Sequence, residues 1–189
     1  EQIKEKTNNL DFYHYLSKIQ DAIGNLTPLM RQSYVVLTTD GRTEQWHPIT
    51  KTIFWEDSDW ESVSKASWMP NNCCLAISDI YFKEISKAAS DKLRELFSLK
   101  QIVQRFSVAG LYQSIRSNIK EVFAQITSKE ISYDFLNWIF LNRSQIFKDG
   151  NIDPQFKAIP ILCKDSNVMQ TIESLGGRVY LPNPEALEL

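Results

Sequence analysis

The sequence of 189 residues has few cysteines and few histidines, and both shortages exclude kinds of site. Three cysteines, of which Cys73 and Cys74 are adjacent, do not make a disulfide framework, because neighbouring cysteines rarely bridge each other. We therefore expect a reducing compartment and a cytoplasmic location. Two histidines far apart in the sequence do not supply the closely spaced ligands of a zinc site. We expect no bound metal and no cofactor.

Glycine is also scarce, with six in the chain, and no long apolar run or strong charge of one sign is present. A hydrophobic content of 43% and a net charge of -2 exclude intrinsic disorder. No apolar run approaches the roughly 20 residues that span a bilayer, and no segment has the layout of a signal peptide, so we expect no membrane contact.

The basic residues form no clustered excess of the kind that nucleic-acid domains carry, so nucleic-acid binding is not expected. They are scattered and interrupted by acidic residues, a pattern typical of a solvated helix face. The nearest approach to a basic track consists of Lys83, Lys87, Lys92, Arg94, Lys100, Arg105, Arg116 and Lys120.

The length suits one domain over residues 1–189. Because the chain begins with Glu1 rather than Met, we interpret it as a fragment of a larger multidomain protein.

Hydrophobic periodicity predicts an α+β fold, in which two small β units (about 33–77 and 158–181) flank a block of amphipathic helices (about 78–148). A helix over residues 9–23 precedes the first β unit, and the polar residues 56–72 predict a loop within it. The β-branched run that ends at Asp40-Gly41 predicts a strand followed by a turn.

Finer predictions concern the ends and faces of the helices. Ser90-Asp91 suits a helix start, Gly110 marks a place where a helix running to Ile126 could break, and residues 168–174 predict a short helix before a last strand over 178–181. In the helix that begins near Ser128, we expect the following apolar residues to be buried: Phe135, Leu136, Trp138, Ile139 and Leu141.

Motifs for catalysis are missing, so we assign no catalytic residue. The chain has no G-x-S-x-G elbow and no glycine-rich phosphate loop, and carboxylate pairs such as Asp57 and Asp59 usually serve loop solvation. An enzyme that acts on nucleic acid or phosphate esters through an unrecognised site stays an alternative. It would bring Asp40, His47 and Asp165 onto one concave surface.

Four tryptophans within 23 residues are the most unusual feature: Trp46, Trp55, Trp60 and Trp68. One interpretation places them in the core of the first β unit. The other makes them an exposed interaction surface, since tryptophan is a frequent interface anchor.

The order of short motifs resembles the regions that follow the ATPase domain in sacsin-like proteins, whose ATPase domain is of the ninety-kilodalton heat-shock chaperone type (the GHKL superfamily). The motifs that carry the resemblance are Phe12–Leu16, Val35–Gly41, Ile53–Trp55, Leu93–Leu99, Tyr133–Leu136, Ile159–Leu162 and Val179–Pro182. The second β unit departs from the pattern because Asp165-Ser166 lacks the glycine of the turn, and the first lacks the proline before its strand.

The resemblance implies a non-catalytic module of a larger chaperone-like ATPase, which contacts other domains of the parent chain or a client protein. The nucleotide site of that superfamily uses an E-x-x-x-N helix and a D-x-G-x-G turn. Glu5 and Asn9 match the first by spacing alone, and no D-x-G-x-G occurs, so we expect no ATP binding by this chain. A self-association domain is a further alternative.

Overall fold

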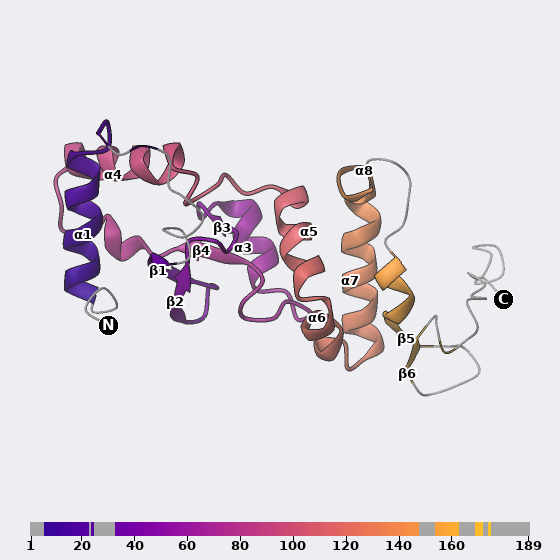
Figure 1. Ribbon diagram of the computed structural model, residues 1–189. Coiled ribbons are helices and arrows are strands. Elements are labelled where there is room, and N and C mark those ends of the chain that lie inside the picture. Colours follow the sequence, from indigo (N-terminus) through magenta and orange to yellow (C-terminus); the bar gives the residue numbers. More distant parts are fainter. Residues whose placement is uncertain are drawn as a thin grey trace. The chain divides into compact units, whose positions relative to one another are not determined.

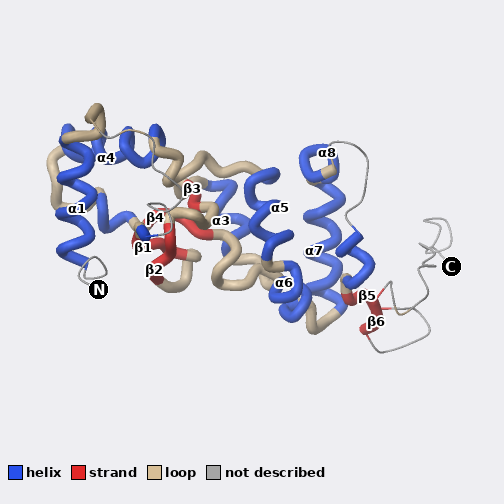
Figure 2. Tube along the Cα trace, in the orientation of Figure 1, coloured by secondary structure: helices blue, strands red, loops and turns tan. Residues whose placement is uncertain are grey.

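The computed structural model describes residues 6–22, 24, 33–147, 154–162, 169–171 and 174. The chain divides into two compact units, Glu1–Ser117 and Asn118–Leu189. Helices accompany a four-stranded sheet in the first unit and a two-stranded sheet in the second, which confirms the predicted α+β class (Figures 1 and 2). A single domain over the whole chain stays a prediction.

The first unit is built on a mixed sheet in the order β2-β1-β4-β3. Its strands are β1 (Val35–Thr39), β2 (Glu44–Pro48), β3 (Ile53–Phe54) and β4 (Leu75–Ile77). Strand β1 is antiparallel to both of its neighbours, whereas β3 and β4 are parallel. The predicted β unit over residues 33–77 is therefore confirmed.

The predicted turn after β1 is confirmed at Asp40-Gly41. The Oδ1 atom of the buried Asp40 accepts hydrogen bonds from the backbone N–H groups of Arg42 (2.8 Å) and Thr43 (2.7 Å). Gly41 adopts a φ of 82°, a left-handed conformation that glycine adopts without strain. A Cβ atom here would also lie 3.3 Å from the Oγ of Ser64, so both the backbone angle and the space favour glycine.

The prediction of a loop over residues 56–72 is wrong, because helix α3 (Ser58–Ser64) forms within it. Asp57 caps the helix by accepting a hydrogen bond from the N–H of Trp60 at 2.8 Å. Trp60 and Ser64 are the buried residues on the inner side of the helix. The helix supplies the crossover that a pair of parallel strands such as β3 and β4 requires.

A short extended segment within the predicted helical block lies beside β3. The N–H of Trp55 donates to the carbonyl of Gln104 at 2.8 Å, and the N–H of Gln104 donates to the carbonyl of Ile53 at 2.8 Å. The chain around Gln104 thus extends the sheet beyond β3. These contacts are distant in sequence, which is why the local pattern did not predict them.

Three longer helices and one 3-10 turn complete the first unit. They are α1 (Lys6–Lys18), η2 (Asp79–Tyr81), α4 (Lys87–Leu99) and α5 (Val108–Ser117). Helix α1 packs against α4 (Figure 1). The start predicted at Ser90-Asp91 is wrong, because Ser86 caps α4 through a hydrogen bond from the N–H of Ala89 at 3.3 Å.

Gly110 does not break its helix, because α5 continues through it and ends at Ser117. A Cβ atom at position 110 would lie 3.2 Å from the ring of Phe54 and 3.0 Å from the Oγ of Ser107. The glycine therefore lets α5 approach β3 closely. The change of helix occurs at Asn118 instead.

The core of the first unit is aromatic and contains a buried hydrogen-bond network. The rings of Tyr13, Tyr81 and Phe97 contact each other edge-to-face, with centroids 5.3–5.8 Å apart. The hydroxyl of Tyr81 accepts from the N–H of Leu37 (2.8 Å) and donates to the Oδ1 of Asn9. These contacts join α1, β1 and η2, and they satisfy polar groups that would be costly to bury alone.

The second unit is mainly helical. Its elements are α6 (Ile119–Gln125), α7 (Lys129–Leu141), α8 (Arg143–Ile146), η3 (Pro154–Ala158), β5 (Pro160–Leu162) and β6 (Met169–Thr171). Phe135 of α7 is buried against Phe123 of α6, with ring centroids 6.3 Å apart. The hydroxyl of Ser132 donates to the carbonyl of Pro160 at 2.8 Å, which joins α7 to β5.

The second β unit differs from its prediction in one element. Residues 169–171 form strand β6 and pair antiparallel with β5, with Ile161 opposite Gln170, so the helix predicted over residues 168–174 is wrong there. Strand pairing with the preceding strand β5 outweighs the weak local helical pattern. The strand predicted over residues 178–181 lies outside the described residues.

Candidate functional site

The four tryptophans do not form an exposed surface. Trp60 and Trp68 are 0% and 2% exposed, so neither can contact a partner, and the expectation of a surface through these two is wrong. Trp46 and Trp55 are partly buried and pack against the core of the first unit. The interpretation that places the tryptophans in the core is the one that the burial supports.

Trp55 belongs to an aromatic group that holds a surface cation. Its ring lies 5.8 Å from that of Phe82, and the guanidinium of Arg94 lies 4.2 Å from the Phe82 ring and 5.2 Å from the Trp55 ring. Such stacking is worth about 0.5–1 kcal/mol at an exposed site. Arg94, one of the scattered basic residues, therefore stabilises an aromatic surface of the protein.

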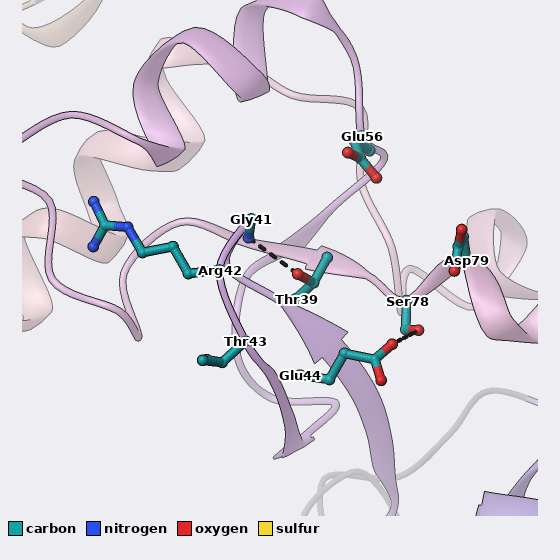
Figure 3. Close-up of a pocket in the computed structure, with 8 residues that line it drawn as sticks. All are labelled: Thr39, Gly41, Arg42, Thr43, Glu44, Glu56, Ser78 and Asp79. Atoms are coloured by element: carbon teal, nitrogen blue, oxygen red, sulfur yellow. Dashed lines mark hydrogen bonds between the residues drawn. The ribbon is translucent and has the colours of Figure 1, made fainter.

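A polar pocket lies at the end of the β1–β2 hairpin (Figure 3). It has a volume of about 280 Å³. Its lining residues are Thr39, Gly41, Arg42, Thr43, Glu44, Glu56, Ser78 and Asp79. The lining contains three carboxylates and one guanidinium, so its net charge is negative.

Three of the four charged groups of this pocket, those of Arg42, Glu44 and Asp79, are engaged with protein partners. The hydroxyl of Ser78 donates to the Oε1 of Glu44 (Figure 3), and Asp79 pairs with Lys83 at 2.7 Å. The Arg42 side chain extends away from the carboxylates in Figure 3, and its Nη1 donates to the Oδ1 of Asn71 at 3.0 Å. No histidine or cysteine among the described residues lines the pocket, so Ser78 has no imidazole base beside it there to activate it as a nucleophile.

Asp40 and His47, two residues of the hypothetical concave site, have structural roles. The carboxylate of Asp40 shapes the hairpin turn. His47 is buried, and its Nδ1 lies 2.7 Å from the Oγ1 of Thr38. Burial, followed by the positive charge of Lys51, lowers the pKa of His47, so its neutral form is favoured. Asp165 lies outside the described residues.

Among the described residues, the remaining candidates for metal binding or nucleophilic chemistry are also separated or buried. Cys73 and Cys74 are buried, and burial, with a smaller contribution from Cys73, raises the pKa of Cys74 to about 12. At neutral pH Cys74 is therefore a thiol rather than a reactive thiolate. Within the ranges that the structure describes, no three His, Cys, Asp or Glu residues are grouped as a metal site.

The second unit carries an exposed apolar surface that the sequence reasoning missed. Tyr133, Leu136, Phe140 and Leu141 of α7 are 69%, 36%, 60% and 66% exposed. Leu136 and Leu141 were expected to be buried, and that expectation is wrong. Phe135 and Ile139 are buried as expected, and Trp138 is partly buried.

The reason is that α7 is apolar on more than one face. Its buried face presents Ser132, Phe135 and Ile139, and a second apolar face remains in solvent. Periodicity locates apolar faces but cannot state which of two will be covered. The run of aromatic and aliphatic residues over 133–141 was the available signal for this surface.

A cation is attached to the exposed face of α7. The guanidinium of Arg143 lies 4.3 Å from the ring of Phe140, and its Nη1 donates to the Phe140 carbonyl at 2.7 Å. Tyrosine, phenylalanine and arginine are enriched at protein interfaces relative to other surfaces. This face, called here the α7 face, consists of Tyr133, Leu136, Phe140 and Arg143.

None of the described helices combines the length and the apolar character that crossing a membrane requires. No model of a known protein family, no curated protein and no solved structure matches the chain.

Proposed function

We propose that the chain is a non-catalytic interaction module that binds another protein, or another domain of a larger protein, through the α7 face. The observation that supports this proposal is the exposure of Tyr133, Leu136 and Phe140 side by side on one helix. Large apolar side chains that are contiguous and exposed mark contact sites more often than isolated ones do. This proposal moves the interaction surface from the tryptophans of the first unit to α7.

The apolar groups are sufficient for a reversible contact. Complete burial of a Leu or Phe side chain contributes about 1.5–3 kcal/mol, so covering the exposed parts of these side chains contributes about 3–5 kcal/mol. Apolar surface of the partner adds a similar amount, against an association cost of at least ~4 kcal/mol. Arg143, already held over Phe140, adds a donor whose rotamer entropy is partly lost before binding.

The resemblance to sacsin-like proteins supports the same role. In this proposal the chain is a region downstream of a chaperone-like ATPase domain, and it contacts a client or a neighbouring domain while nucleotide hydrolysis takes place elsewhere. The polar pocket of the first unit has no arrangement of groups that favours the alternative of an enzyme. Calorimetry of the 189-residue chain with ATP and Mg²⁺ should show no binding, and micromolar affinity would overturn the non-catalytic role.

Photo-crosslinking tests the contact directly. A benzoylphenylalanine residue is placed at Tyr133 or at Phe140 in the natural full-length protein, and the matched control carries it at the exposed Asp134 on another side of α7. We expect ultraviolet light to produce adducts from positions 133 and 140 but not from 134, with mass spectrometry mapping each adduct to a partner or to another domain. Equal yields at all three positions, or none, would overturn the α7 face as a contact site.

A further inference from the structure

The α7 face, together with Lys129 at the start of the helix, has the spacing of a coiled-coil seam. Lys129, Tyr133, Leu136, Phe140 and Arg143 follow one another at steps of four, three, four and three residues. Residues at this average spacing of 3.5 lie along one face of a helix, where a second helix can pack. The part of the seam on α7, from Lys129 to Phe140, spans about 17 Å at 1.5 Å per residue, and Arg143 follows it in α8.

Both ends of this seam are cationic, whereas its centre is apolar. Arg143, the first residue of α8, keeps its guanidinium against the ring of Phe140, so the charge stays on the seam after α7 ends. At the other end, Lys129 is exposed and lies 3.8 Å from the exposed carboxylate of Glu130. An exposed pair of this kind contributes little, so it does not prevent the ammonium from binding a carboxylate of a partner.

The charges disfavour a second copy of the chain as the occupant. If two α7 helices packed antiparallel through their seams, Lys129 of one copy would come to the level of Arg143 of the other. If they packed in parallel, each cation would face its own counterpart. Both arrangements bring like charges together at each end, which is destabilising.

We propose that the α7 face binds an amphipathic helix whose apolar stripe ends in a carboxylate on each side. Leu136 and Phe140 contact the apolar stripe, and the two carboxylates meet Lys129 and Arg143. This is the helix-in-groove mode of recognition, with anchors at i, i+3 or i+4, and i+7. The inference rests on the proposed function and names the chemistry of its partner.

Two designed helical peptides of about three heptads test this inference. They share a leucine stripe and differ in having Glu or Lys at the two positions that end it. Fluorescence anisotropy with the 189-residue chain should give at least about tenfold tighter binding of the Glu peptide in low salt, and the difference should shrink as salt screens the charges. A chain carrying both Lys129→Glu and Arg143→Glu should reverse the preference, and its circular dichroism should match that of the unchanged chain.

Other outcomes overturn the inference in distinguishable ways. Equal binding of the two peptides would remove the charge selection but leave a helix-binding face, and so the proposed function, in place. Absence of binding by either peptide would reject a helical partner, while the crosslinking at Tyr133 and Phe140 would decide the proposed function separately. A dimer in sedimentation equilibrium that Phe140→Ser abolishes would identify a second copy as the occupant and overturn the inference.

Discussion

Removal of one buried hydroxyl, by Tyr81→Phe, should destabilise the first unit strongly. The hydroxyl of Tyr81 accepts from the N–H of Leu37 at 2.8 Å and donates to the Oδ1 of Asn9. Tyr81 is 1% exposed, and burial raises its pKa, so the group stays protonated and able to donate. The variant leaves the Leu37 N–H buried and without this acceptor.

The magnitude follows from these two bonds. A buried polar group that loses its partner costs about 1–3 kcal/mol, so the loss of both bonds should lower the free energy of unfolding by about 2–4 kcal/mol. For a unit of this size, that corresponds to a fall in Tm of roughly 8–16 °C. The ring itself is unchanged, so the edge-to-face contacts with Tyr13 and Phe97 should persist.

Urea denaturation at neutral pH, followed by tryptophan fluorescence, measures this loss. The matched control is Tyr15→Phe, which removes an exposed hydroxyl from α1 and should change stability by less than about 0.5 kcal/mol. Asn9→Ala and the double variant complete a cycle, in which a coupling of about 1 kcal/mol or more is expected. If Tyr81→Phe is no more destabilising than the control, the network does not hold α1 to the sheet as argued.

Three further predictions concern the first unit. Burial lowers the pKa of His47 below its unfolded value of about 6.5, so its contribution to stability is complete above that pH and is lost as the pH falls through the lowered value. In urea titrations, His47→Gln should therefore make the free energy of unfolding depend less on pH below neutrality. An unchanged pH dependence would refute this. Gly41→Ala should lower the free energy of unfolding by about 1–2 kcal/mol, because a φ of 82° strains any residue with a Cβ atom. Gly24→Ala, with nothing within 4 Å of the added carbon, should lower it much less in thermal unfolding, and equal losses would contradict the argument. Asp57→Ala should lower the free energy of unfolding by about 1 kcal/mol, because the Trp60 N–H loses its capping acceptor. Asp57→Asn keeps an acceptor oxygen and should lose much less in the same assay; an equal loss would show that the cap is not the cause.

The differences between prediction and structure have a common origin in the α3 and α7 segments. The stretch of polar residues around Trp60 suggested a loop because Asp and Ser favour turns, yet the same Asp57 that suits a turn also caps a helix. In α7, apolar residues occur on more than one face, so the burial of Leu136 and Leu141 could not be decided from their spacing. In both cases, burial depends on which surface from elsewhere in the chain packs against the helix.

The sequence placed a possible interaction surface on the tryptophans, whereas the exposed aromatic side chains lie on α7. Aromatic residues as contact anchors were expected, but the choice of Trp60 and Trp68 was wrong, because large aromatic side chains serve a core and an interface equally well. The Arg143 guanidinium above the Phe140 ring, the feature that marks the α7 face, is a contact between neighbouring turns that composition does not reveal.

The sequence by itself determined the α+β class, the strand and turn that end at Asp40-Gly41, and the presence of a helical block, since these follow from local backbone preferences and the period of apolar residues. Tertiary structure alone decided that Gln104 extends the sheet and that the ring of Trp60 is covered while the ring of Phe140 is left in solvent. The physical reason is that burial depends on the partner surface, and that surface is assembled from residues far away along the chain.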